Sequence, residues 1–187
     1  DNFLKNGFPS RKLENWKFSD INQIIKKNIG ELTFYNDYKI ENEINDDIFI
    51  KEIEHNKIVI VNGKVQQFNF EYEESDKINI TILDTLNQNL NQDNSLLSLN
   101  NSFSNKIHNI LVKKNYSLKK PLIIYQITNE KVSNTNINFQ LNFDLEESSS
   151  IKIVNFSEDN SEKNFINNLF NFNLDKNAIL KLSLIHI

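Results

Sequence analysis

The chain of 187 residues contains no cysteine and no methionine, and it has only three glycines, two prolines and one tryptophan. Without cysteine it forms no disulfide, offers no thiolate to a metal and carries no thiol that could accept a persulfide. Three scattered glycines exclude a glycine-rich phosphate-binding loop. The chain does not begin with methionine, and its last ten residues stop inside an apolar alternating pattern. We therefore expect a fragment that lacks a few residues at the front and a large part at the back.

Charge and hydropathy limit the classes of partner. Acidic residues outnumber basic ones by 25 to 21, and the lysines occur as pairs rather than as the basic stripe typical of nucleic-acid-binding proteins. No apolar run approaches the roughly 20 residues of a membrane span, and no signal peptide is evident. We therefore expect no nucleic acid and no membrane among the partners. The absence of cysteine agrees with a reducing compartment, so we expect a cytoplasmic protein, or one in the equivalent organelle stroma or matrix.

The clearest helix signal lies between Ser19 and Gly30. Ser19 is the expected N-cap with Asp20 at the first helical position, and Gly30 stands where a C-terminal cap is expected. One face carries the apolar stripe Ile21, Ile24, Ile25 and Ile29. A second helix is expected at Leu96–Phe103, after a polar loop over Leu86–Asn94.

The first half also predicts strands. Residues 57–65 read as a hairpin, because two apolar runs flank the dipeptide Asn62–Gly63, a strong signal for a tight turn. The alternation of Ile78, Ile80 and Ile82 with polar residues predicts a half-buried strand.

The second half carries a repeat of strand, polar corner and strand. Residues 137–145 alternate apolar and polar side chains over nine positions, and a polar turn follows. The pattern returns 29 residues later, so that 166–174 repeats 137–145 and 180–182 repeats 151–153. A weaker upstream copy at the same spacing aligns Asn109 with Asn138, and Leu122 with Ile151.

A fixed repeat of this kind indicates a solenoid, whose coils bury their apolar faces against one another. The alternative is a β-sandwich of antiparallel hairpins, because alternation alone does not fix strand direction. Asparagine is abundant, which we attribute to AT-rich coding. The regular alternation argues against a disordered, prion-like chain.

No catalytic constellation emerges from the sequence. His55, His108 and His186 lie at no metal-ligand spacing. His186 points either inward, as a core residue after three alternating leucines, or outward if the neighbouring isoleucines take the core face. The paired carboxylates Glu73–Glu74 and Glu146–Glu147 are interpreted as solvated corners. A polysaccharide-degrading site that groups Glu146 with Asp175 on neighbouring coils is the less favoured alternative.

The most specific string spans Gly7 to Ser19. On physical grounds it is a docking helix, with Ser10 as its cap and Leu13 and Trp16 on one buried face. The string resembles the N-terminal signature of the SufB/SufD family of iron–sulfur cluster assembly proteins, in its SufD-like form, with Phe18 where tyrosine is usual. The signature residues, taken as structural and of unknown role, are Gly7, Phe8, Pro9, Arg11, Glu14, Trp16 and Lys17.

The resemblance extends to three further motifs. They are the Asn62–Gly63 turn, the Leu99–Asn100 helix with Ser102 in place of alanine, and the rung over Asn164–Ala178. It implies a mainly β fold: a right-handed parallel β-helix core, truncated here, preceded by a small helical or α+β region. We expect 1–95 to form that N-terminal helical and hairpin region, and 96–187 to form the first coils.

The resemblance also implies a function. Such a chain is a non-catalytic scaffold subunit that works with SufB-like subunits and the SufC-like ATPase, and the cluster is assembled by the full complex. We expect no catalytic residue, metal ligand or cofactor site within the fragment, because the family's cluster-linked residues and ATPase-docking helices lie in the missing part. The alternatives are a carbohydrate-active β-helix enzyme and a passive solenoid interaction module.

Overall fold

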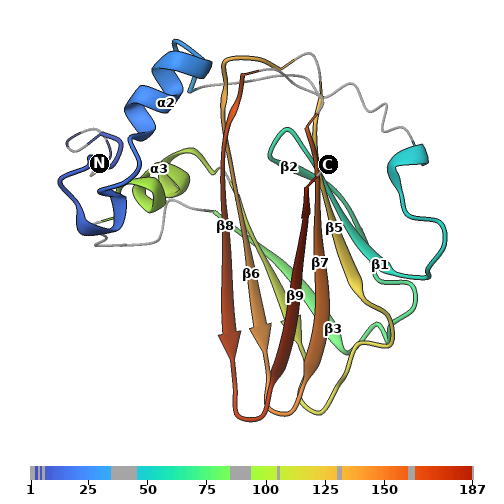
Figure 1. Cartoon of the computed structure of the whole chain (residues 1–187). Helices are drawn as coiled ribbons and strands as arrows, with labels where there is room; N and C mark the ends of the chain where they lie inside the picture. The colour runs from blue at the N-terminus through green and yellow to red at the C-terminus, as the bar shows by residue number, and fades with distance from the viewer. Residues whose placement is uncertain are drawn as a thin grey trace.

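The structure is a computed structural model that describes residues 3, 5, 7–34, 46–84, 94–104, 106–129, 132–159 and 163–186. It is mainly β, with two packed sheets and a few short helices beside them (Figure 1). In chain order the elements are η1 Glu14–Trp16, α2 Ile21–Asn28, η2 Asp46–Ile48, β1 Asn56–Val61, β2 Lys64–Asn69, β3 Ile78–Asp84, α3 Ser95–Phe103, β4 Lys106–Val112, β5 Leu122–Thr128, β6 Asn136–Leu145, β7 Ser150–Asp159, β8 Phe165–Leu174 and β9 Ile179–His186.

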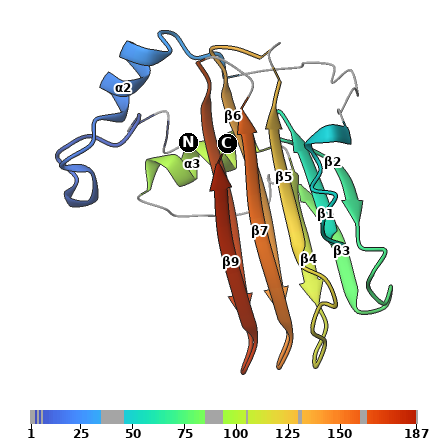
Figure 2. The same cartoon turned by 45° about the vertical axis from the view of Figure 1, so that its right-hand side comes forward.

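From β4 onward, successive strands alternate between the two sheets. One sheet has the order β2-β1-β5-β7-β9 and the other β3-β4-β6-β8; Figure 2 shows β5, β7 and β9 side by side in the first. Neighbours along β1-β5-β7-β9 and along β4-β6-β8 are parallel, and only the two outer pairs, β1–β2 and β3–β4, are antiparallel. A sandwich of antiparallel hairpins is therefore excluded for β4 to β9.

The predicted 29-residue repeat is confirmed in the strand register. Ile137 lies opposite Ile166 in the β6–β8 pair, and Ile151 lies opposite Leu180 in the β7–β9 pair. Each apolar residue therefore stacks on its own counterpart one repeat later.

The upstream copy predicted at the same spacing is wrong in register. Asn109 lies opposite Asn142 rather than Asn138, a separation of 33 residues. Leu122 lies opposite Ile153, a separation of 31. The cause is the length of the corners: nine residues link β4 to β5, whereas four link β6 to β7. The strands keep their apolar faces toward the core, so the extra residues remain in the corner.

The core lies between the two sheets. Phe143 of β6 and Ile124 of β5 are fully buried in one cluster that draws on both sheets. A second, smaller apolar cluster forms on the outer face of the five-stranded sheet, where Phe49 and Ile50 cover Tyr125. The alternation of 137–145 therefore predicted a strand with the right residues facing the core.

The corners repeat a backbone conformation. Ser148 and Asn177 both have left-handed φ angles, 58° and 60°, and Asn115 at the equivalent corner has 59°. At the opposite end of the strands, Asn134 and Lys163 have φ angles of 53° and 64°. In each case the residues at 29-residue spacing adopt the same turn geometry.

The hairpin predicted at residues 57–65 is confirmed. β1 and β2 pair antiparallel, and both turn residues have positive φ, 50° at Asn62 and 77° at Gly63. These angles match the type I′ turn that Asn-Gly favours. Through β1–β5 and β3–β4 pairing, residues 56–84 supply strands to the same two sheets as the repeat.

Helix α2 is confirmed but its cap is not Ser19. Asp20 is the N-cap, and its carboxylate accepts from the backbone N–H of Gln23 at 3.0 Å. The carboxylate at Asp20 thus takes the capping role that the preceding hydroxyl was expected to have. Gly30 closes the helix with a φ of 96°, as predicted. Ile24 is 51% exposed, so the predicted apolar stripe is buried only in part.

The other predicted elements have mixed outcomes. The strand at Ile78–Ile82 is confirmed as β3, although Ile82 is exposed at the sheet's outer edge. The second helix is confirmed as α3. The loop predicted over 86–94 lies, apart from Asn94, outside the described residues. No described helix has the length and apolar character needed to cross a membrane.

Candidate functional site

The signature segment folds as a compact turn rather than as the predicted docking helix. Only Glu14–Trp16 is helical, as one 3-10 turn. The residue before it is Leu13, which makes no side-chain capping bond, so the prediction of Ser10 as the cap is wrong. Leu13 is 48% exposed and Trp16 is half-buried, so the predicted buried face is not formed. Both side chains remain open to solvent because one short turn provides no continuous face to bury.

A chain of phenylalanine rings attaches the signature to the sheets. Phe8, a signature residue, packs edge-on against Phe165 of β8 at 5.4 Å between ring centroids, and against Phe3 at 5.1 Å. Phe3 in turn contacts Phe34, which contacts Phe103 of α3 at 5.4 Å. The segment is therefore held by apolar contacts at its beginning, beside Pro9, which is buried.

The charged signature residues pair with one another at the surface. Arg11 lies 3.7 Å from Asp20 and donates to Gln23 at 3.5 Å, which ties the turn to the start of α2. Lys17 contacts Glu14 at 2.6 Å. These pairs are exposed, so they orient the turn and contribute little to stability. Gly7 has a left-handed φ of 63°.

The motif around Asn100 has a structural role that the sequence did not reveal. Asn100 is 1% exposed, and its side-chain Nδ2 donates to the backbone oxygens of Phe139 at 3.0 Å and Asn167 at 2.6 Å. One side chain of α3 thus joins β6 to β8. Leu99 is fully buried, whereas Ser102 is exposed, so serine is tolerated where the family has alanine.

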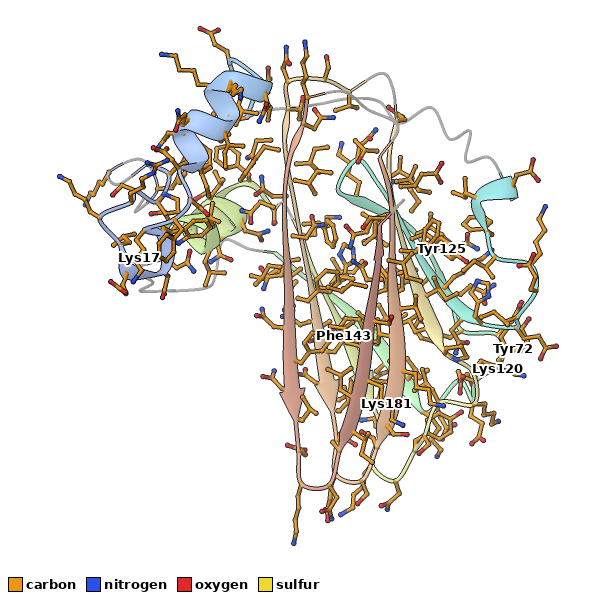
Figure 3. The ribbon with its side chains drawn as sticks, viewed as in Figure 1. Lys17, Tyr72, Lys120, Tyr125, Phe143 and Lys181 are labelled. Carbon is orange, nitrogen blue, oxygen red and sulfur yellow. The ribbon has the colours of Figure 1, made fainter. Side chains whose placement is uncertain are left out.

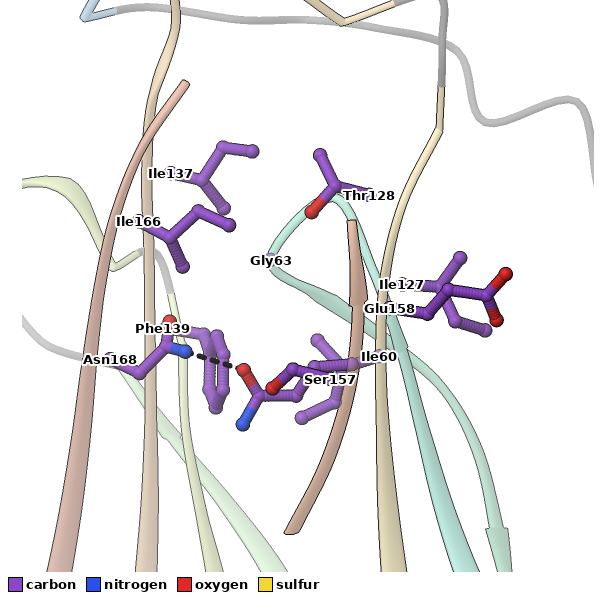
Figure 4. Close-up of a pocket in the computed structure, with 11 residues that line it drawn as sticks. Ile60, Gly63, Ile127, Thr128, Ile137, Phe139, Ser157, Glu158, Ile166 and Asn168 are labelled. Carbon is purple, nitrogen blue, oxygen red and sulfur yellow. Dashed lines mark hydrogen bonds between the residues drawn. The ribbon is translucent and has the colours of Figure 1, made fainter. Parts of the chain in front are cut away.

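The most enclosed cavity described lies between the two sheets near the turn of the first hairpin. Its volume is about 300 Å³, and Figure 4 shows Ile137, Ile166 and Phe139 on one side, with Ile60 and Thr128 facing them. The lining is mostly apolar, which suits packing or a small apolar guest.

A relay of side-chain amides crosses the wall of this cavity. Asn168 of β8 donates to Gln126 of β5, and Gln126 donates to Asn155 of β7. Gln126 and Asn155 are buried, and the relay ties the two sheets together inside an otherwise apolar core. An amide network of this kind fixes register, because one slipped strand would leave buried polar groups unpaired.

The three histidines do not form a common site. The His55 ring lies 2.9 Å from the Tyr125 hydroxyl, which also accepts from the backbone N–H of Ile50 at 3.1 Å. Burial raises the pKa of that tyrosine. His108 lies against Phe68, and burial, together with Lys106, lowers its pKa. The backbone of His186 pairs with Ser157; its side chain, and so its predicted direction, lies outside the described part.

The corner carboxylates are engaged by lysines. Glu146 lies 3.5 Å from Lys113, and Glu147 forms an ion pair with Lys114. Asp175, the proposed partner of Glu146 on the next repeat, is exposed. These residues therefore act as corner residues, in keeping with the favoured interpretation.

Glu73 is the exception among the carboxylates. It accepts four hydrogen bonds, at 2.7 to 3.1 Å, from the Tyr116 hydroxyl, the Asn56 amide and the backbone N–H groups of Lys119 and Lys120. Burial alone would raise its pKa, but the bonds from Lys119, Asn56, Tyr116 and Lys120 outweigh it and leave the pKa below its usual value. Glu73 therefore locks the connection between β2 and β3 onto the long corner after β4.

No described group of three or more histidine and carboxylate side chains is placed to hold a metal ion. Sequence reasoning missed Asn100, Glu73 and Gln126, because each acts through partners 29 or more residues away. Polar residues inside otherwise apolar strands, such as Gln126, were the available signal. The sequence matches no protein-family model and no curated protein.

Proposed function

We propose that this chain is the N-terminal part of a SufD-like scaffold subunit, and that β4 to β9 form the first coils of a right-handed parallel β-helix. The support is that successive strands alternate between two sheets while neighbours within each sheet run parallel. A chain that winds in one direction produces this arrangement, in which every coil pairs only with the coils before and after it.

The observation that carries the proposal is the shared 29-residue step. It holds in both sheets, from Asn136 opposite Phe165 to Ser157 opposite His186. It holds in the corners too, where Ser148 and Asn177 share a left-handed backbone. Strands and corners that repeat together define a coil, and stacked coils make a rigid frame for partner subunits.

The interior of that frame is closed by packing, which supports a non-catalytic role. Phe143 stacks on Phe172 at 5.4 Å, and the core residues of both sheets fill the space between them. A carbohydrate-active β-helix enzyme would need carboxylates or cations grouped on one face of adjacent coils. Here Glu146 and Glu147 each pair with a lysine instead. ATP hydrolysis then falls to the SufC-like partner, and the iron–sulfur cluster is the cargo of the complex.

Co-expression tests the proposal directly. The full-length protein from which this chain comes is produced with the SufB-like and SufC-like subunits of the same organism, and tagged pull-down is followed by stoichiometry measurement. A stable complex that assembles clusters only with ATP is the expected result. Failure to associate with either subunit would sink the assignment.

The isolated chain of 187 residues supplies a second test. We expect that it assembles no iron–sulfur cluster alone, because it has no cysteine and its scaffold role needs partners. Reconstitution with iron and sulfide under anaerobic conditions should give no stoichiometric, stable chromophore. A stoichiometric cluster on this chain would contradict the proposal.

A further inference from the structure

The signature turn exposes an aromatic ring that has no structural use in the fold. Phe18 is 89% exposed, the highest value among the described large apolar side chains that face solvent. Its described contact is with the ammonium of its neighbour Lys17, 5.2 Å from the ring centroid. A tyrosine here would place its hydroxyl in solvent, so the replacement by phenylalanine breaks no buried hydrogen bond. A ring held in water carries a cost that a binding partner removes.

Further apolar side chains flank Phe18 in the same short stretch. Leu13 is 48% exposed and Ile24 is 51% exposed, and Trp16 between them is half-buried. The contacts of Arg11 with Asp20 and Gln23 hold the turn against the first turn of α2. Exposed apolar groups are therefore presented on a turn and a helix that are fixed relative to each other.

The charge of this surface is opposite to that of the chain. Residues 11–27 carry five cations and two carboxylates, whereas the whole chain has a net charge of −4. Both carboxylates are already engaged, Glu14 by Lys17 and Asp20 by Arg11. Three lysines of the segment make no described ion pair: Lys12, Lys26 and Lys27. The geometry and charge together suit a partner that is apolar and acidic.

We propose that the signature segment, with Phe18 as its anchor, is a docking surface for an acidic amphipathic segment of a partner protein. Aromatic anchors ringed by complementary charge are typical of protein interfaces. Figure 3 shows Lys17 at the end of the molecule far from the sheets, where a partner has free access. The proposal rests on the proposed function in one respect: the scaffold role supplies a subunit to dock.

An anionic membrane is the less favoured occupant. A helix that lies on a bilayer needs a free apolar face, but Ile21 and Ile25 of α2 are buried at 8% and 7% exposure. Helix α2 also has only eight residues. The remaining exposed side chains suit a short peptide segment better than a lipid surface.

The only tryptophan, Trp16, reports binding at this surface. The probe is a tryptophan-free synthetic helix with leucine on one face and glutamate on the other, and a version with lysine for glutamate is the charge control. We expect the acidic peptide to shift Trp16 emission to the blue with saturable binding, and the basic peptide to have no effect. Vesicles of phosphatidylserine and phosphatidylcholine form the third arm.

Variants identify the surface. We expect Phe18→Ser, and separately Lys26→Glu with Lys27→Glu, to weaken peptide binding about tenfold each. Lys152→Glu with Lys181→Glu makes the same charge change on neighbouring strands β7 and β9 and should leave binding unchanged. Equal thermal unfolding of all variants shows that the fold is intact, since every substituted side chain is exposed.

The outcomes separate the two proposals. Absent peptide binding, equal binding by all variants, or binding to vesicles alone would overturn the docking surface. If the full-length protein still co-purifies with its SufB-like and SufC-like subunits in that case, the scaffold role stands. If the peptide binds as expected but no subunit associates, the docking surface stands and the scaffold role fails.

Discussion

The side-chain amide of Asn167 donates to the side-chain oxygen of Asn138, which lies 29 residues earlier in the chain and one strand away, at 3.1 Å. Asn171 and Asn142 repeat the contact at 2.9 Å. Amide side chains in register on adjacent parallel strands form ladders of this kind. The abundant asparagines, which we attributed to AT-rich coding, therefore also bond one coil to the next.

Substitution of Asn167 tests the value of the ladder. The amide of Asn167 also donates to the backbone oxygen of Leu96 in α3 at 2.8 Å, so Asn167→Ala leaves two acceptors without a partner. We expect a loss of about 2 kcal/mol in the free energy of unfolding, measured by urea titration. Asn173→Ala is the control, because Asn173 is exposed and its partner Asp144 regains water. Equal effects of the two substitutions would show that the ladder has no stabilising role.

The sequence predicts the strands of the second half well because one property decides them. Alternation with period two places Phe139, Leu141 and Phe143 on the core face, and the 29-residue spacing then fixes the register of β6 on β8. The upstream register failed because corner length varies, and a corner of nine residues carries no apolar pattern by which to count.

The contacts that hold the N-terminal part could not be predicted in the same way. The ring chain from Phe8 to Phe165 joins residues with no shared periodicity. The four bonds to Glu73 come mainly from backbone N–H groups, whose direction depends on the turn around Lys119 and not on residue type. Sequence patterns report which faces are apolar, and they are silent on which backbone groups converge.

The Glu73 carboxylate gives a pH-dependent contribution to stability. Its pKa is lowered in the folded protein, so its stabilisation is present above the pKa of the unfolded chain and is lost as pH falls through the folded value. We expect Glu73→Gln to lower the free energy of unfolding by about 2 kcal/mol at pH 7, and the difference from the unsubstituted protein to shrink on acidification below the usual pKa of a glutamate. Chemical unfolding at a series of pH values measures both.

The neighbouring carboxylate provides the control for Glu73. Glu74 forms a half-exposed ion pair with Lys119 at 3.0 Å, so Glu74→Gln should change the free energy of unfolding by less than about 1 kcal/mol. A Glu74 effect as large as that of Glu73, or a Glu73 effect that persists undiminished in acid, would contradict the role given to the four hydrogen bonds.

Gly63 combines backbone strain with a close approach. Its φ is 77°, and a Cβ built there would lie 2.7 Å from Cγ2 of Ile137 and 3.1 Å from the backbone oxygen of Asn138. Gly30 has a φ of 96° but nothing within 4 Å of its Cβ position. We expect Gly30→Ala to cost about 1 kcal/mol, from backbone conformation alone. Gly63→Ala should cost about 1 to 3 kcal/mol more, because it also overpacks the β6 wall.

Thermal and urea unfolding of the two alanine variants separates these terms. The excess at Gly63 isolates the contact of the first hairpin with β6, which closes one end of the space between the sheets. Similar losses for both variants would mean that the turn moves away from β6 without cost, and that the hairpin does not seal the core.

Lys163 occupies a left-handed corner position, with a φ of 64°, at the position 29 residues after Asn134. A residue with a Cβ is strained in this region, and glycine is not. We therefore expect Lys163→Gly to raise the free energy of unfolding by about 0.5 to 1 kcal/mol. Lys152→Gly makes the same replacement in the middle of β7, where extended backbone is required, and should lower it by about the same amount. Opposite signs from one substitution type, read by urea unfolding, support a corner geometry fixed by the repeat. A loss at both positions would show that the Lys163 corner can relax out of its left-handed conformation.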